Sequence, residues 1–286
     1  MPQIDVPAGT IHYQDTGGEG PVLVLLHGLI MDHTQWREVL PGLREDYRCI
    51  LPTLPLGAHR TPMRPGTDLS LRSQVNTVAD FLEGLDLHDV TLVVTDWGGG
   101  MLLTHEGRDD RVARLVICPS EAFENFPPGL PGRMAGLAAR TPGGIFLALR
   151  QLRMRRLRNT RLLMGWMAKR PLDDDLVEGW TAPGLASPGV RRDLRRYASS
   201  RFDEAELIVM TGSLASFDRP ALVLWATEDK VMPRSHGARL AELLPQGRLV
   251  EVDDSYVLMQ LDRPDAVTQH LRAFLESTAD AVGRSA

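Results

Sequence analysis

The chain lacks the sequence features of a secreted or membrane-spanning protein. Cysteine occurs only twice in 286 residues, and Cys49 and Cys118 both lie in apolar, strand-like runs. They are expected to be buried thiols of a reducing compartment, not parts of a disulfide framework. The first residues contain neither the basic region nor the apolar segment of a signal peptide, and no apolar run is long enough to span a bilayer. We therefore expect a cytoplasmic protein.

An excess of positive charge is also absent. The formal net charge is −5 at pH 7, so the composition predicts neither a nucleic-acid partner nor attraction to an anionic membrane. The hydrophobic share of 43% and the charged share of 24% are typical of a globular, enzyme-sized domain. We expect a small-molecule substrate, no cofactor and no metal, no nucleic-acid or membrane partner, and a monomer or homodimer.

Apolar runs and amphipathic stretches alternate in both end portions of the chain. The run at 21–26 is apolar throughout, which is typical of a parallel strand buried on both faces. The repeated order of apolar runs and amphipathic stretches predicts an α/β fold with a doubly wound sheet and right-handed crossovers. Further strands are predicted at 9–15, 47–51, 90–95, 111–118, 220–225 and 247–252, and helices at 33–45, 71–87, 234–244 and 264–277.

The alternation stops between 122 and 216, where helical signals and clusters of proline and glycine dominate. The simplest interpretation is an inserted helical cap at 122–216 on a core formed by 1–121 and 217–286. Within it, residues 150–170 carry eight basic side chains and no acidic one. Such a run is most often a solvated helix face; the alternative is that it attracts an anionic substrate or partner.

Asp96 stands in a segment typical of a sharp strand-to-helix turn. Strand-compatible residues precede it, and Trp97 and three glycines follow. Small residues let the backbone turn tightly, which would present the carboxylate at the tip of the sheet. So placed, the carboxylate can attack carbon as a nucleophile; the structural alternative is that it caps the following helix. Serine is absent from this turn, which disfavours ordinary ester hydrolysis.

Three motifs together resemble the α/β-hydrolase superfamily: His27-Gly28 after a buried strand, the turn at 95–99, and the segment 224–229. The Asp-Trp-Gly-Gly sequence of the turn is similar to that of haloalkane dehalogenases and epoxide hydrolases, whose nucleophile is aspartate. The resemblance implies a mostly parallel eight-stranded sheet flanked by helices, with an inserted helical cap. It also implies that Asp96 forms an alkyl-ester intermediate, which a histidine-activated water then hydrolyses.

The same resemblance implies further site residues. The oxyanion hole would use the backbone N–H of Trp97 and that of Leu29 or Ile30, and the Trp97 indole would bind a departing halide. Leu29 stands where the best-matching dehalogenases often carry an asparagine as second halide donor, so weaker halide binding is expected. Asp229 and Glu121 both match positions of the triad acid, and either would orient a base.

The family's histidine is absent from its expected position. Alignment of the last strand places Val257 at the histidine position and Tyr256 at the preceding glycine, and no one-residue slip restores a histidine. His33 and His59 are the candidate substitute bases, because both loops leave the carboxyl edge of the sheet, where ligands bind.

The cap offers candidate pocket residues. Trp166, with Tyr256 and Val257 from the core, is expected to contact substrate; the alternative is that these side chains only pack the cap onto the sheet. For methionines such as Met164 the same two interpretations apply, substrate contact or packing of the cap onto the sheet. Tyr197 is the one cap tyrosine available to protonate an epoxide oxygen.

Three functional interpretations remain open. The first is haloalkane-dehalogenase-like or epoxide-hydrolase-like hydrolysis of a small or medium apolar substrate. In the second, Asp96 acts as a general acid or base, its pKa raised by burial and by Glu121 or Asp229. That chemistry suits isomerisation, elimination, cyclisation or decarboxylation. The third is a non-catalytic ligand-binding protein on the same fold.

Overall fold

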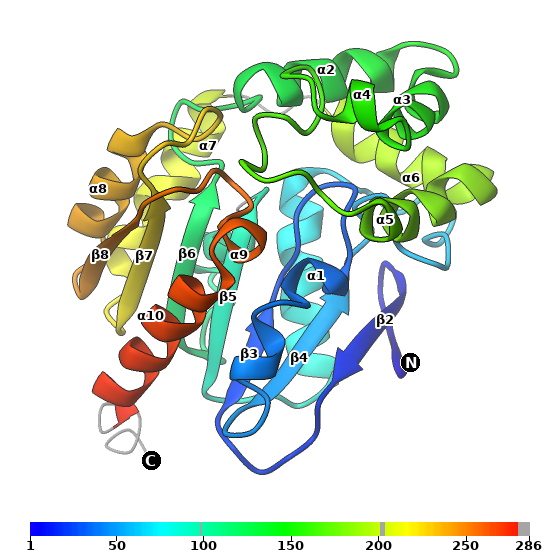
Figure 1. The fold of residues 1–286 in the computed structure, drawn as a ribbon. Coiled ribbons are helices and arrows are strands. Elements are labelled where there is room, and N and C mark those ends of the chain that lie inside the picture. Colours follow the sequence, from blue (N-terminus) through cyan, green and yellow to red (C-terminus); the bar gives the residue numbers. More distant parts are fainter. Residues whose placement is uncertain (98, 201–203, 280–286) are drawn as a thin grey trace.

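An eight-stranded sheet runs through the centre of the molecule (Figure 1). The computed structural model describes residues 1–97, 99–200 and 204–279. The strands follow the order β1-β2-β4-β3-β5-β6-β7-β8, in which β2 is antiparallel to both neighbours and the strands from β4 to β8 are parallel. Their bounds are β1 (Gln3–Val6), β2 (Gly9–Asp15), β3 (Val22–Leu25), β4 (Arg48–Thr53), β5 (Val90–Asp96), β6 (Val112–Ser120), β7 (Ala221–Ala226) and β8 (Gly247–Val252).

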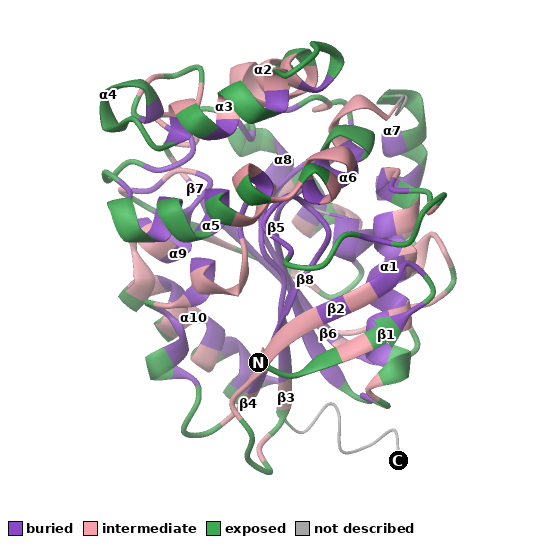
Figure 2. Cartoon of the chain, turned by 90° about the vertical axis from the view of Figure 1, so that its right-hand side faces the viewer, coloured by how far each residue is buried: buried purple, intermediate pink, exposed green. Residues whose placement is uncertain are grey.

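The central strands are buried on both faces, as the continuous apolar runs predict. Successive residues of a strand point to opposite sides, so Leu92 and Val94 of β5 join one hydrophobic cluster and Val93 joins the other. In β7, Trp225 packs into the first cluster and Leu224 into the second. Figure 2 shows these strands as the buried centre of the molecule.

Helices cover the two faces of the sheet. The first cluster lies against α1 (Leu71–Gly84), the 3-10 helix η3 (Gly99–Thr104) and α8 (Arg234–Leu243). The second lies against the 3-10 helices η1 (His33–Trp36) and η2 (Leu40–Gly42), and against α9 (Met259–Asp262) and α10 (Pro264–Ser277). No helix in the described part of the chain is long and apolar enough to cross a bilayer.

Two predicted helices are wrong in type, and one strand was missed. Residues 33–45 form the short helices η1 and η2, because Pro41 and Gly42 interrupt the helical spacing. The helix expected after Asp96 is the 3-10 helix η3, which begins in a glycine run of low helix propensity; Gly98 of that run lies outside the described residues. Strand β1 is short and on the sheet edge, with only its last residue buried, so it gave no strong pattern.

The helices between 129 and 199, five in number, lie above the carboxyl ends of the parallel strands (Figure 1). They belong to the segment that we propose as the cap, 122–216. The chain then returns to β7 through α7 (Glu204–Gly212) and the 3-10 helix η4 (Ser213–Ser216). The five helices are α2 (Gly129–Arg140), α3 (Gly144–Leu152), α4 (Arg155–Arg158), α5 (Asp174–Ala186) and α6 (Pro188–Ser199).

Gly100 supports the turn after β5 by its lack of a side chain. A Cβ atom there would lie 2.5 Å from Leu26 Cδ1 and 2.7 Å from Val94 Cγ1. We expect Gly100→Ala to lower the free energy of unfolding by about 1–3 kcal/mol, the usual cost of overpacking, measured by urea denaturation. Gly179→Ala is the matched control, since a Cβ in this α5 position meets no atom within 4 Å. It should raise stability by about 0.5–1 kcal/mol; equal effects of the two substitutions would refute the packing argument.

Candidate active site

Asp96 ends β5 and presents its carboxylate at the edge of the sheet. Its backbone adopts a left-handed conformation with φ 61°, which is uncommon for a residue with a side chain and marks a strained turn. Its carbonyl oxygen accepts a hydrogen bond from the Glu121 N–H at 2.9 Å, which ties the turn to the end of β6. The side chain is only 5% exposed, so the carboxylate is held in a largely dry environment.

The carboxylate faces the loop that follows β3. Its Oδ2 atom accepts a hydrogen bond from the Leu29 N–H at 2.7 Å. The close approach of this loop to the Asp96 carboxylate requires a glycine at position 28, because a Cβ atom on Gly28 would lie 2.5 Å from Oδ2. The Gly28 N–H donates to the Gln35 side chain at 2.7 Å, so the loop that carries Leu29 is itself anchored.

Of the two backbone N–H groups predicted as oxyanion donors in this loop, the one that points at Asp96 is that of Leu29. The Ile30 N–H donates to the Leu56 carbonyl at 2.8 Å, so it is not available at Asp96. Ile30 instead lines the cavity with its side chain, from a backbone with φ 65°.

An apolar cavity of about 340 Å³ lies in front of Asp96. Its floor is formed by Leu29, Asp96 and Glu121, and its walls come mainly from α2, α3 and the segment after α4. Small residues of α2 at a spacing of three, Gly132, Ala135 and Ala138, leave room for the cavity, and this spacing is visible in the sequence. The other lining residues are Ile30, Met31, Pro128, Pro131, Met134, Leu137, Thr141, Gly144, Leu147, Ala148, Gln151, Leu152, Leu162, Leu163, Met164, Met167 and Val231.

Carboxyl groups, and no cation, gather around the cavity floor in the described residues. Burial raises the pKa of Asp96 to about 6, although the Leu29 N–H acts in the opposite direction. Burial and then the neighbouring Asp96 charge raise the pKa of Glu121 well above its ordinary value, and Glu121 Oε2 has no hydrogen-bond partner. Since two adjacent carboxylates repel, the ionised form of Asp96 favours the protonated form of Glu121.

Asp229 and Tyr197 are two further ionisable groups that the Asp96 charge affects, although neither is among the described residues that line the cavity. Burial raises the pKa of Asp229 to about 7, against the opposing N–H groups of Met232 and Val231, and the Asp96 charge contributes to the rise. The Tyr197 hydroxyl of α6 is buried without a hydrogen-bond partner among the described residues, and its pKa is raised by burial and by the charges of Glu121 and Asp96. Both proposed triad acids therefore lie within the electrostatic reach of Asp96.

The predicted halide role of Trp97 does not agree with the structure. The Trp97 indole N–H donates to the His27 carbonyl at 2.9 Å, and the side chain is only 2% exposed. Trp97 is not among the described residues that line the cavity. Its ring packs over Gly99, where a Cβ atom would lie 1.8 Å from the ring. The indole therefore stiffens the turn instead of facing a leaving group.

The two predicted substitute bases are not brought to Asp96. His59 Nε2 lies 3.3 Å from Asp193 Oδ2 of α6, with both side chains buried. His33 Nδ1 lies 3.4 Å from the Thr53 hydroxyl, and burial lowers its pKa. No histidine is among the described residues that line the cavity. Both rings instead tie loops at the carboxyl edge to their surroundings, a role that sequence position alone does not reveal.

The three predicted substrate contacts also lie outside the cavity wall. Val257, at the position of the family's histidine, is fully buried in the hydrophobic core. Trp166 packs partly buried against the same core. The Tyr256 ring lies 5.8 Å from the Lys230 ammonium, outside the core. Met164 and Met167 do line the cavity, so the methionines and not the tryptophan contribute its apolar wall.

Known proteins of one family share the fold of this chain. A model of the α/β-hydrolase fold family matches residues 21–264. The chain belongs to this family. The crystal structure of an inferred ancestral haloalkane dehalogenase superposes with a TM-score of 0.75, covering 98% of this chain and 100% of that one at 22% identity. That likeness shows the eight-stranded fold with its flanking helices.

Curated relatives of this α/β-hydrolase fold chain include a decarboxylase and a haloalkane dehalogenase. A cis-3-alkyl-4-alkyloxetan-2-one decarboxylase of Xanthomonas campestris is 28% identical over 96% of this chain and 95% of its own length. A haloalkane dehalogenase of Mesorhizobium japonicum is 33% identical, over 49% of this chain and 47% of its own length. The chain is thus similar to the decarboxylase from end to end and to the dehalogenase over about half.

The buried charge at Asp96 has a measurable effect on stability. The folded-state pKa of Asp96 is about 6, against an ordinary value of 3.8, so the folded protein favours the protonated form. The free energy of unfolding therefore decreases as the pH rises from 3.8 through about 6. We expect Asp96→Asn to be more stable than the native protein at pH 8, by up to about 3 kcal/mol. The difference should vanish below pH 3.8. Urea denaturation at several pH values measures it.

The control for this experiment is Asp110→Asn, a change at an exposed aspartate. Its effect should stay within about 0.5 kcal/mol at every pH. A pH-independent stability difference for Asp96→Asn would contradict the burial of an ionisable carboxyl at this site.

Proposed function

We propose that this chain is an enzyme in which Asp96 attacks a saturated carbon of an apolar substrate and that its turnover is not hydrolytic. The observation that supports this is the composition of the cavity floor. It holds the Asp96 carboxylate on a backbone N–H, one further carboxyl group (Glu121) and, among the described residues, no histidine to activate water. Asp96 is then able to form an alkyl ester, but its hydrolysis lacks the usual base.

The substrate class that we infer is a β-lactone with alkyl substituents on the ring. The name of the full-length relative, an alkyl-oxetanone decarboxylase, supports this class. An alkyl-substituted four-membered lactone is apolar apart from its ester group, and the cavity wall above the carboxyl floor is mostly apolar, with Thr141 and Gln151 as its polar residues. The half-length match to a dehalogenase is consistent with the same first step, attack by aspartate on carbon.

The reaction proceeds in two steps that balance without water. In the first, an Asp96 oxygen attacks the ring carbon that bears the ring oxygen; that C–O bond breaks, and the ring oxygen leaves with the electron pair as a carboxylate. In the second, the bond from the carboxylate carbon to the neighbouring ring carbon breaks. Its electron pair forms the C=C bond, and the Asp96 carboxylate departs with the pair of its own C–O bond. The products are an alkene, CO₂ and unchanged Asp96.

The groups around Asp96 suit these two reaction steps. Burial and the Asp96 charge raise the pKa of Glu121 and favour its protonated form, whose O–H is able to donate to the carboxylate that develops when the ring opens. The apolar cavity withholds water from that carboxylate. Loss of CO₂ disperses the negative charge, so the dry site disfavours the carboxylate more than the transition state. The raised pKa of Asp96, about 6, still leaves it ionised above neutral pH.

Conversion of a cis-3,4-dialkyl-oxetan-2-one tests the proposal directly. We expect formation of the alkene and CO₂, detected by gas chromatography with mass spectrometry. Asp96→Asn should lower kcat/KM by a factor on the order of 10⁴, because the nucleophile is lost while the shape of the cavity is kept. His33→Ala is the control and should retain activity, since His33 does not line the cavity. Formation of the β-hydroxy acid instead of the alkene would refute the non-hydrolytic reaction.

An alkyl bromide separates attack from hydrolysis. We expect it to alkylate Asp96 and to remain attached, because bromide loss leaves an ester with no internal carboxylate to eliminate. Intact-mass spectrometry should show a stable adduct on the native protein and none on Asp96→Asn. Continuous release of the alcohol would instead show that a hydrolytic base is present, which favours dehalogenase-like turnover.

A further inference from the structure

The charge of the chain is distributed very unevenly. Residues 125–172 contain ten basic side chains and no acidic one, although the whole chain carries a net charge of −5. Four of these ten pair with acids from elsewhere, for example Arg158 with Asp174 and Lys169 with Glu228. The remaining six are exposed and have no ion pair within the described residues: Arg133, Arg140, Arg150, Arg155, Arg156 and Arg161.

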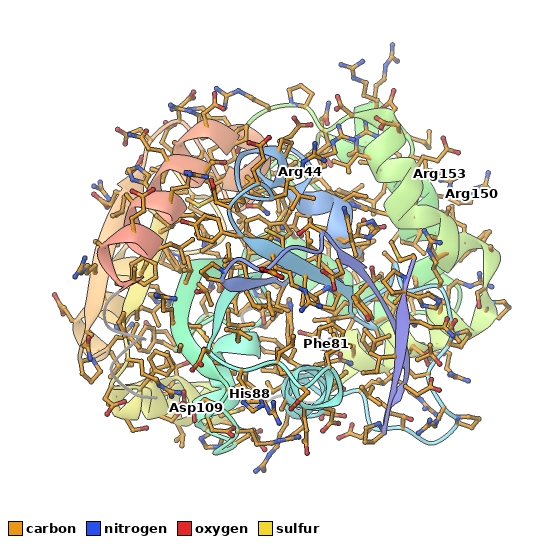
Figure 3. The ribbon with its side chains drawn as sticks, turned by 90° about the horizontal axis from the view of Figure 1, so that it is seen from below. Arg44, Phe81, His88, Asp109, Arg150 and Arg153 are labelled. Atoms are coloured by element: carbon orange, nitrogen blue, oxygen red, sulfur yellow. The ribbon has the colours of Figure 1, made fainter. Side chains whose placement is uncertain are left out.

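Exposed apolar side chains occur in the same segment. Leu137 is 57% exposed, Leu147 56%, Met154 57%, Leu157 37% and Leu162 43%. They come from α2, α3, α4 and the turns beside α4, which form the outermost layer of the molecule in Figures 1 and 2. We call the outer surface of residues 129–162 the cap face. Figure 3 shows Arg150 and Arg153 at the outer edge of the molecule, well apart from Arg44.

The cavity in front of Asp96 reaches the cap face. Leu137, Leu147 and Leu162 line the cavity and are also exposed to solvent. The apolar wall of the cavity therefore continues into the apolar side chains of the surface, between arginines. An alkyl substrate that lies at this surface is able to enter the cavity along apolar contacts alone.

We propose that the cap face docks on the surface of an anionic lipid bilayer. Exposed leucine and methionine side chains enter the headgroup region, and the unpaired arginines contact lipid phosphates. The expectation of no membrane partner was drawn from the net charge, which averages over a basic cap face and an acidic remainder. The proposal does not depend on the reaction at Asp96.

Charge and shape favour a bilayer over the other occupants. A second copy would bring two basic surfaces together, which is unfavourable. An acidic protein matches the arginines, but it leaves the continuity of the apolar surface with the cavity wall unexplained. A bilayer matches both features, because it carries anionic headgroups over an apolar interior that dissolves alkyl compounds.

Vesicle co-sedimentation of the full chain tests the proposal. We expect binding to phosphatidylcholine vesicles that contain phosphatidylglycerol, weaker binding at higher salt, and little binding to phosphatidylcholine alone. The double variant Arg155→Ala/Arg156→Ala should weaken binding on the order of thirtyfold. Arg44→Ala/Arg248→Ala removes two exposed arginines on other parts of the surface and should leave binding unchanged. Leu147→Ser tests insertion and should also weaken binding.

Thermal unfolding of each variant shows whether it is folded, independently of binding. Absence of binding to the anionic vesicles would overturn the proposal, as would an equal effect of the two arginine pairs. Binding to polyglutamate without binding to vesicles would indicate an acidic protein partner instead. A dimer in light scattering that Leu147→Ser dissociates would indicate a second copy.

Discussion

The hydrogen bond from the Leu29 N–H to the Asp96 carboxylate is the contact on which the site depends. It holds a carboxylate that the left-handed turn after β5 forces into a nearly dry position. Gly28 permits the approach of the two loops, and the Trp97 indole fixes the turn to the His27 carbonyl. The pKa of about 6 that follows from burial makes Asp96 a carboxylate that is ionised above neutral pH yet poorly solvated, which is the state that the proposed nucleophilic role requires.

The fold could be predicted from the sequence with few errors. Strands such as 247–252 and the helix 264–277 have the predicted bounds, because continuous apolar runs and helical spacing report burial directly. The errors fall where local composition competes with periodicity, at Pro41-Gly42 and in the glycines after Trp97.

The site was predictable only in part. Motifs locate backbone positions, and so Asp96, Leu29, Glu121 and Asp229 are found near one another. Motifs do not report where a side chain points: the Trp97 indole donates to a carbonyl, and His59 pairs with Asp193 of α6. That pairing joins residues 134 positions apart, and no local pattern in the sequence encodes it.

The central claim is that the Asp96 ester is resolved by elimination and not by water. Turnover of the alkyl β-lactone in oxygen-18 water, followed by mass spectrometry of the peptide that contains Asp96, tests it most directly. Hydrolysis of an alkyl ester at the aspartyl carbonyl exchanges a carboxylate oxygen with solvent, whereas elimination returns both original oxygens. We predict an unlabelled Asp96 after many turnovers. Progressive incorporation of oxygen-18 into Asp96 would contradict the account.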